Sequence, residues 1–296
     1  MRLSGGVVVG LSGLLTVVSC VRQSPEFYKS GTPQLLAEGV ISTDRCETRC
    51  SLTPDGKTLF FATMGWDAQD SLNQDIYVSR WQKGRWSQPE PVPFNTKYQE
   101  FDPAVTPDGR WLYFCSDRAG GVGGADLWRV ALQGEGYGAP ENLGPVLNSR
   151  GDDWGPSFSR DGRTMVLSST GRPGAGGHDL FRSVWTGKEW AAPANLGPQV
   201  NSPYDDFDPC VVGALEKIIF ASDRPGGPGG LDLWETEAED GGLGTWRQPQ
   251  PLPTPLNSDS WDTCPYLAPS GKAFYFSSTR GAGSPAGADI YVVVAK

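Results

Sequence analysis

Apolar and polar positions along this chain follow one pattern that returns five times. In the copy from Phe101 to Trp128, a short alternating stretch leads into a Pro-Asp-Gly turn. An apolar, aromatic run follows at Trp111–Ser116, and a glycine-rich loop then ends on Asp126. Alternation with a period of two, and short apolar runs between turn residues, are typical of β-strands. The pattern therefore predicts a chain made of repeated units of short strands.

The spacing of the turns defines the repeat. Asp55, Asp108 and Asp161 are 53 residues apart, and the same register places Ala214 and Ser270 at the turns of copies four and five. The Asp that closes the glycine-rich loop recurs at Asp75, Asp126, Asp179, Asp232 and Asp289. A period of this length with several strands per unit is typical of radial β-propellers.

Each unit is expected to hold four strands, of which the fourth is a Trp/Tyr-x-x-Pro segment leading to an Asn. The chain ends after the third strand of copy five, and the unmatched segment 33–42 resembles Pro140–Asn148. That segment is expected to complete the last blade and close the ring, which removes exposed sheet edges. We therefore predict an all-β, five-bladed propeller with four strands per blade. Its repeats are expected at about 43–95, 96–148, 149–201, 202–257, and 258–296 plus 33–42.

The N-terminus has the features of an export signal. One Arg precedes an apolar run that is too short and too glycine-rich for a transmembrane helix. Val17-Val18-Ser19-Cys20 resembles the lipobox of bacterial lipoproteins, in which the Cys carries the lipid. We predict a lipoprotein signal peptide over 1–19, lipidation of Cys20, a tether over 20–32 and a propeller over 33–296. An ordinary signal peptide with an incidental Cys is the alternative.

Charge and cysteine content narrow the possible partners. The formal charge of −9 and the lack of a Lys/Arg cluster argue against nucleic-acid binding.

Five cysteines follow Cys20, so at least one thiol is free or pairs outside the chain. Cys115 is expected to be a buried thiol. Two weak candidate disulfides remain open, namely Cys210 with Cys264 and Cys46 with Cys50.

The turns followed by LYF, SDR and DLW, and the fuller unit SDRxGGxGGxDLW, resemble the TolB-like (WD40-like) propeller repeats of bacterial envelope proteins. The resemblance covers residues 33–296, nearly all of the expected mature chain. TolB itself has an additional N-terminal α/β domain and six blades, so we do not expect this chain to be TolB. The resemblance implies a cell-envelope location. Val21 after the lipobox Cys favours the outer membrane, with the protein facing periplasm or exterior.

One position, eight residues before the turn, carries an acid in every copy: Glu47, Glu100, Asp153, Asp206 and Asp262. It precedes the innermost strand, so these acids are expected to circle one mouth of the central channel. There they would repel one another and attract a metal ion, a cationic group or a basic tail. Alternatively, each acid caps a loop inside its own blade, because repeats duplicate structural devices.

Other features carry less weight. His178, the only histidine, has no Ser or Cys partner in the sequence pattern and is not expected to be catalytic. Asp117-Arg118 and Asp223-Arg224 are interpreted as local ion pairs. Trp66 and Trp261 fall outside the repeat consensus and could stack on sugar rings.

The leading hypothesis is a monomeric, non-enzymatic, lipid-anchored envelope propeller. It would bind a protein, peptidoglycan or a glycan through the acidic ring, and would touch the membrane only through its lipid. The alternatives are a glycoside hydrolase-like propeller enzyme, in which two carboxylates act as acid and base, and a scaffold stabilised by Ca²⁺. No other cofactor is expected, and no catalytic residue is assigned.

Overall fold

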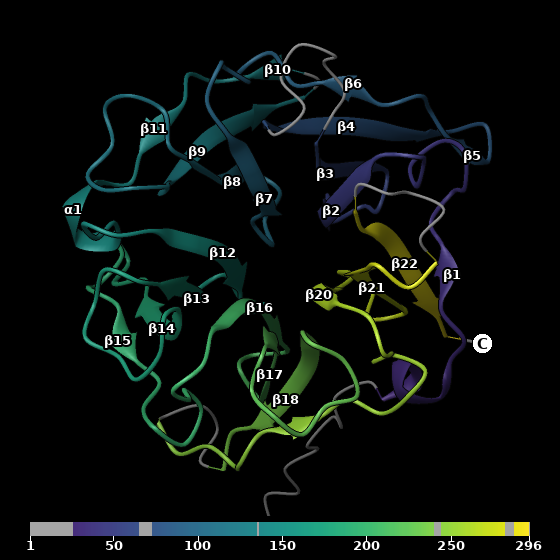
Figure 1. Ribbon diagram of the computed structural model, residues 1–296. Coiled ribbons are helices and arrows are strands. Elements are labelled where there is room, and N and C mark those ends of the chain that lie inside the picture. Colours follow the sequence, from purple (N-terminus) through teal and green to yellow (C-terminus); the bar gives the residue numbers. More distant parts are fainter. Residues whose placement is uncertain (1–25, 65–72, 135, 240–243, 282–286, 296) are drawn as a thin grey trace, which may run out of the picture.

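The computed structural model describes residues 26–64, 73–134, 136–239, 244–281 and 287–295. Five small antiparallel sheets stand in a ring around a central axis, as Figure 1 shows. This is the predicted five-bladed β-propeller with four strands per blade. In the first two blades the outermost strand is split into two short pieces.

Strands at equivalent places in the five blades share a position in the ring. The innermost strands are β2 (Cys46–Leu52), β7 (Glu100–Val105), β12 (Asp153–Phe158), β16 (Asp206–Val212) and β20 (Asp262–Leu267). The second strands are β3 (Thr58–Met64), β8 (Trp111–Ser116), β13 (Thr164–Ser169), β17 (Lys217–Ser222) and β21 (Ala273–Ser278). The third strands are β4 (Gln74–Gln82), β9 (Asp126–Gln133), β14 (Asp179–Val184), β18 (Asp232–Glu237) and β22 (Asp289–Val294).

Outer strands are short. They are β5 (Arg85–Trp86), β6 (Glu90–Pro91), β10 (Gly136–Tyr137), β11 (Glu141–Asn142), β15 (Ala194–Asn195), β19 (Gln250–Pro251) and β1 (Gln34–Leu35). A one-turn helix, α1 (Gly144–Leu147), follows β11. Proline occurs in β6 and β19, where an edge position tolerates a residue without an N–H donor.

The ring closes as the sequence predicts. β1 pairs with β22 of the last blade, with Gln34 opposite Val292. Ser42 follows, and its hydroxyl donates to the Ile290 carbonyl at 3.0 Å. In the second blade Asn148 has the corresponding role, because its amide bonds both the N–H and the carbonyl of Leu127. The N-terminal segment therefore completes the fifth blade.

The two ends of the ring differ in their connections. We call the end with the hairpins between first and second strands the turn face, and the end with the glycine-rich loops the loop face. On the turn face, Gly109 has φ +70°, a left-handed conformation that favours glycine. Asp108 fixes this turn, since it accepts hydrogen bonds from the Thr106 hydroxyl and the Arg110 N–H. On the loop face, Asp126 accepts hydrogen bonds from the N–H groups of Val122 and Gly123 and so fixes the end of the glycine-rich loop.

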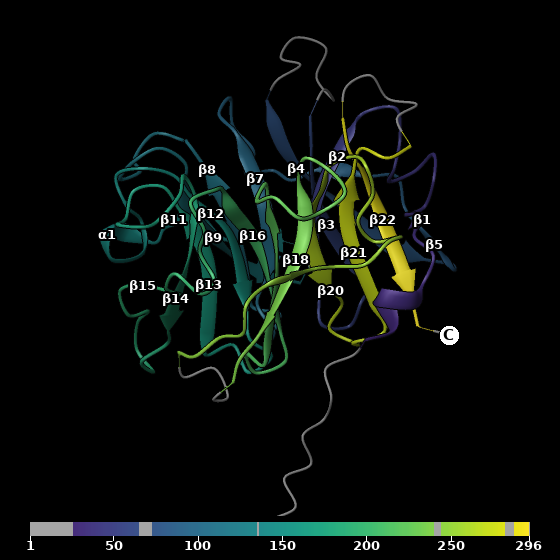
Figure 2. The same ribbon diagram turned by 60° about the horizontal axis from the view of Figure 1, so that its bottom comes forward.

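A short 3₁₀ turn, η1 (Phe27–Ser30), packs against the body before β1 begins, beside β22 in Figure 2. Tyr28 is completely buried and stacks on Phe274 with ring centroids 4.7 Å apart. Lys217 is also buried, and it binds Glu26 at 2.6 Å and Glu235 at 2.9 Å. Residues 26–31 are therefore part of the folded body, whereas the sequence pattern places them in the tether. Cys20 and the predicted signal peptide lie outside the described residues.

All five cysteines in the described part of the chain are buried free thiols, so neither candidate disulfide forms. Cys46 and Cys50 are four residues apart on one strand, and a strand rise of about 3.3 Å per residue separates their thiols too far. Cys264 instead contacts Asp208, with sulfur and oxygen 3.1 Å apart. Cys115 is buried, as predicted. Within the described residues no helix is long and apolar enough to cross a membrane.

Candidate functional site

The five repeated acids lie at the start of the innermost strands, but their side chains are fully buried. Each accepts the backbone N–H of the residue four positions earlier. The five donors are Thr43 to Glu47, Thr96 to Glu100, Ser149 to Asp153, Ser202 to Asp206 and Ser258 to Asp262. The acids therefore fasten the entry to each blade, and none of them presents an exposed carboxylate at the channel mouth.

Four of these acids are also neutralised within their own blade. Each meets an arginine 18 or 19 residues later, and the pairs are Glu100–Arg118, Asp153–Arg172, Asp206–Arg224 and Asp262–Arg280. Arg118 lies 2.9 Å from Glu100 and also donates to the Phe94 carbonyl at 3.0 Å. The arginine of the SDR motif thus pairs with the acid of its strand. Neighbouring Asp117 instead accepts the Gln99 N–H, so its predicted pairing with Arg118 was wrong.

Glu47 is the exception. The residue 18 positions after it is Gly65, so this blade has no arginine in that register. Glu47 accepts hydrogen bonds from the hydroxyl and the N–H of Thr43. Burial raises the pKa of the Glu47 carboxyl to about 7, and the Thr43 bonds only partly offset this effect.

A second ring of residues, which the sequence analysis did not identify, lies on the channel axis. Every innermost strand has a β-bulge just after its first residues. At each bulge one residue adopts positive φ: Arg49 (35°), Asp102 (51°), Gly155 (60°), Asp208 (51°) and Cys264 (52°). Such angles are uncommon for residues other than glycine and store strain of about 1–3 kcal/mol each. Bulges redirect side chains, and these side chains meet across the blades.

Arg49 is the centre of this axial cluster. Its buried guanidinium reaches from blade 1 to the Pro156 carbonyl of blade 3 at 3.1 Å and the Pro209 carbonyl of blade 4 at 3.3 Å. It also lies 3.4 Å from the Asp208 carboxylate. A Cβ added at Gly155 would lie 3.4 Å from the guanidinium and 3.2 Å from Pro209, so a small residue is needed there. One side chain therefore holds three blades together on the axis.

Asp102 contributes the remaining charge. It accepts the Gly155 N–H at 2.9 Å and faces the Cys115 thiol at 3.9 Å. Burial, and secondarily the nearby Asp208 carboxylate, raise the pKa of Asp102 to about 7, although Arg49 opposes the shift. With one arginine for two carboxylates, the cluster carries one excess negative charge when both are ionised. Protonation of Asp102, whose pKa is raised to about 7, would remove this excess charge.

A sequence signal for this cluster does exist. The position two residues after each acid is polar or small in all copies, but its residue type changes from copy to copy: Arg49, Asp102, Gly155, Asp208 and Cys264. The positions beside it change much less. In four copies a proline follows directly, namely Pro103, Pro156, Pro209 and Pro265. A varying polar residue inside an apolar strand is a feature that repeat architecture alone does not explain.

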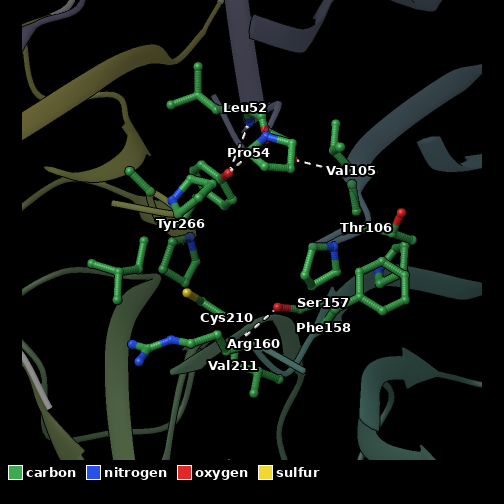
Figure 3. A pocket seen from close by; sticks show the side chains of 18 of the residues that line it. Leu52, Pro54, Val105, Thr106, Ser157, Phe158, Arg160, Cys210, Val211 and Tyr266 are labelled. Carbon is green, nitrogen blue, oxygen red and sulfur yellow. Dashed lines mark hydrogen bonds between the residues drawn. The ribbon is translucent and has the colours of Figure 1, made fainter. Parts of the chain in front are cut away.

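A pocket of about 320 Å³ opens at the channel mouth on the turn face, shown in Figure 3. Its wall is apolar and rich in proline, with Leu52, Val105, Phe158 and Tyr266 around the opening. Arg49 also lines it, and Arg160 lies at its rim. These two are the charged residues among the described residues that line the pocket, and both are cationic.

The rim is also where the five-fold pattern breaks. The rim position is proline in three blades, at Pro54, Pro107 and Pro269, but Arg160 and Gly213 in the other two. Arg160 donates its N–H to the Gly213 carbonyl at 2.7 Å, which fixes this part of the rim. Its exposed side chain forms no ion pair with any described residue.

Hydroxyl groups around the pocket join neighbouring blades. The Ser51 hydroxyl accepts the Val105 N–H, and the Ser157 hydroxyl accepts the Val211 N–H, each at 2.9 Å. Tyr266 accepts the Leu52 N–H at the same distance, as the dashed lines in Figure 3 show. The pocket wall is therefore held in a fixed shape.

The remaining predicted features are placed as follows. His178 stacks against Trp154 with ring centroids 4.2 Å apart and faces Asp205 at 3.3 Å. Trp261 is 58% exposed on the loop face, whereas Trp66 lies outside the described residues. Among the described residues there is no group of three or more His, Cys, Asp or Glu side chains arranged to hold a metal ion.

No protein-family model matches the chain, and no curated protein matches its sequence. Its fold is similar to that of a putative TolB from Agrobacterium tumefaciens (19% identity, TM-score 0.51, 80% of this chain and 71% of that chain covered). It is also similar to a thermostable family-43 glycoside hydrolase (10% identity, TM-score 0.60, 86% of this chain and 91% of that chain covered). A third similar structure is the catalytic domain of a Coprinopsis cinerea GH62 α-L-arabinofuranosidase (11% identity, TM-score 0.52, 88% of this chain and 96% of that chain covered). At these identities the likenesses establish the β-propeller fold and nothing finer.

Proposed function

We propose that this protein is a non-enzymatic, lipid-anchored propeller of the bacterial cell envelope that acts as a binding scaffold. Cys20 would carry the anchor at the outer membrane, and the channel mouth on the turn face would hold the partner. The observation that carries this proposal is the break of five-fold symmetry around the pocket. An asymmetric rim favours one orientation of an asymmetric partner, and the exposed Arg160 supplies this asymmetry.

The pocket favours a protein segment as the occupant. Its wall is apolar, with Leu52, Val105, Phe158 and Tyr266, and burial of apolar side chains would supply the binding free energy. Of its two charged lining residues, Arg49 is already paired with Asp208, so the exposed Arg160 at the rim would bind an acidic residue of the segment. This proposal moves the binding site from the acidic ring to the channel mouth. The five acids remain structural groups in it.

Capture from an envelope extract tests the proposal. We expect the wild-type protein to retain a partner that the Arg160→Glu variant loses, because the substitution reverses the charge at the rim. Lys57→Glu is the matched control, since Lys57 lies in the equivalent hairpin of blade 1 but does not line the pocket. A partner that Arg160→Glu retains as well as wild type does would contradict the channel-mouth site.

The alternative hypothesis, a glycoside hydrolase, is supported by the similarity of this fold to the family-43 and GH62 structures. Asp102 and Asp208 are the carboxylates on the axis, but both are buried, and Arg49 binds one of them. Two carboxylates in that state cannot reach a glycosidic bond as acid and base. Turnover in a glycan hydrolysis screen, lost in Asp208→Asn, would establish that the protein is an enzyme.

The hypothesis of a Ca²⁺-stabilised scaffold is tested by thermal unfolding. A melting temperature that rises by several degrees with Ca²⁺ and falls with EDTA would support it.

A further inference from the structure

A second cavity, of about 630 Å³, lies between blades 2 and 3 on the turn face. Three tryptophans line it, Trp111 from β8 and Trp185 and Trp190 from the third blade, and Tyr113 joins them. We call it the tryptophan cleft. It shares Thr106 and Pro107 with the border of the channel pocket, but its aromatic residues do not line that pocket.

The equivalent cleft between blades 1 and 2 provides an internal comparison. There the same register holds Thr58, Leu132 and Tyr137 in place of the three tryptophans, and the cavity is about 370 Å³. Symmetric packing of the propeller does not require tryptophan at these positions, because the first interface is built without it. The edge-on pair of Trp185 and Trp190 has a counterpart in Trp81 and Trp86 of blade 1, so the feature specific to this cleft is the third tryptophan, Trp111, which begins its second strand.

The aromatic rings are held in fixed orientations. Trp190 donates its indole N–H to the Tyr113 hydroxyl at 3.1 Å, and Trp185 packs edge-on against Trp190 with centroids 5.5 Å apart. The Arg129 guanidinium lies 4.0 Å from the centre of the Trp111 ring. Trp111 and Trp185 are only partly buried, so part of each ring remains accessible in the cleft. Rigid, partly exposed indole rings bind ring-shaped ligands at a low cost in conformational entropy.

Arginines supply the charge of the cleft. Arg110, Arg129 and Arg163 line it against two acids, Asp108 and Asp161. Both acids are engaged in their turns, because each accepts hydrogen bonds from the hydroxyl two residues earlier and from the backbone N–H two residues later. Arg163 is exposed and forms no ion pair with a residue that the structure describes. Free guanidinium groups bind carboxylates through paired N–H donors.

We propose that the tryptophan cleft binds an oligosaccharide that carries carboxylate groups. Arg129 is already paired with Glu141 at 2.9 Å, and Arg110 lies 3.7 Å from Asp108. Indole rings stack on the C–H faces of sugars, while Arg163 binds an acidic substituent. A neutral glycan would use the stacking alone and leave the Arg163 guanidinium without a partner. The site is distinct from the protein site proposed at the channel mouth, and it does not depend on that proposal.

Binding of tetragalacturonate to the full-length protein, followed by calorimetry and tryptophan fluorescence, tests the proposal, with cellotetraose as the neutral sugar. We expect tetragalacturonate to bind at least 10-fold more tightly than cellotetraose. Arg163→Gln and Trp185→Leu should each weaken tetragalacturonate binding at least 5-fold. Lys57→Gln, in the smaller cleft at the position that Arg110 has in the tryptophan cleft, should leave it unchanged.

Three results would overturn the proposal: no binding of tetragalacturonate to folded wild type, equal binding of the two sugars, or wild-type affinity in Arg163→Gln. Because Arg163 is exposed, its replacement should not disturb folding, and circular dichroism verifies this. Arg163→Gln therefore remains decisive if Trp185→Leu destabilises the blade. Neither variant alters a residue of the channel pocket, so this result and the protein-capture result are independent.

Discussion

Single buried charges and their partners explain much of the regularity of this chain. In four blades the arginine that follows the second strand neutralises the acid that begins the innermost strand, as Arg118 does for Glu100. Removing one partner of a buried pair leaves an uncompensated charge, which is far more costly than loss of an exposed ion pair. The SDR motif is therefore maintained by electrostatics within the blade.

This arrangement predicts the effect of Arg118→Met. The buried Glu100 carboxylate would lose its charged partner, and we expect the free energy of unfolding to fall by about 3–5 kcal/mol. Arg247→Met, which removes an exposed pair with Glu237, should cost less than about 1 kcal/mol. Denaturant unfolding of both variants provides the measurement. Adding Glu100→Gln to Arg118→Met should recover part of the loss, and no recovery would contradict the ion-pair explanation.

Among the structural elements, β1 and η1 show how a segment distant in sequence completes the last blade. β1 covers the edge of β22, an edge that would otherwise present unpaired N–H and carbonyl groups. η1 adds Tyr28 to an apolar cluster with Phe274, Phe276 and Tyr291. The folded body therefore includes residues 26–32, which the repeat pattern places in the tether.

Tyr28→Ala tests whether this segment stabilises the ring. Truncation would leave a cavity against Phe274, and we expect a loss of about 3–5 kcal/mol in the free energy of unfolding. Val294→Ala, at an exposed position of the neighbouring β22, should change it by less than about 0.5 kcal/mol. Equal stability of Tyr28→Ala and wild type would mean that η1 is a passive spacer.

Across the whole molecule, the axial cluster joins all five blades. Arg49 of the first blade binds Ser277 of the fifth through its N–H and contacts the third and fourth through its guanidinium. Asp102 of the second blade holds the third through Gly155, and Cys264 of the fifth contacts Asp208 of the fourth. Its protonation state therefore affects the stability of the complete ring.

The pKa of Asp102 gives this cluster a defined pH dependence. The folded protein holds the Asp102 proton up to about pH 7, whereas an ordinary Asp side chain loses it near 3.8. Between these values the unfolded chain binds fewer protons, so the free energy of unfolding falls as pH rises, by at most about 1.4 kcal/mol per pH unit. The contribution of Asp102 is complete below pH 4 and is lost above pH 7. Glu47 acts in the same direction.

Asp102→Asn removes one of these two titrations. We expect wild type to lose more stability than the variant when the pH is raised from 5 to 8, as measured by urea unfolding at each pH. Asp108→Asn is a suitable control, because Asp108 is an exposed turn residue in the same blade. Identical pH profiles for wild type and Asp102→Asn would show that the cluster does not hold a proton.

The sequence alone determined the number of blades, the strands within each and the closure by residues 33–42. These features depend on local chemistry: period-two alternation, turn glycines and capping residues recur at a fixed spacing, and each acts over a few residues. For the same reason the acids could be located but not interpreted. Their burial depends on a partner from another strand.

Only the tertiary structure decided where charge and space remain for a ligand. Arg49 and Asp208 are 159 residues apart in sequence, and bulges on two different blades bring them together on the axis. The channel pocket and the tryptophan cleft likewise form where side chains from several blades converge. Such sites depend on side-chain direction across blade interfaces, which a repeat period does not encode.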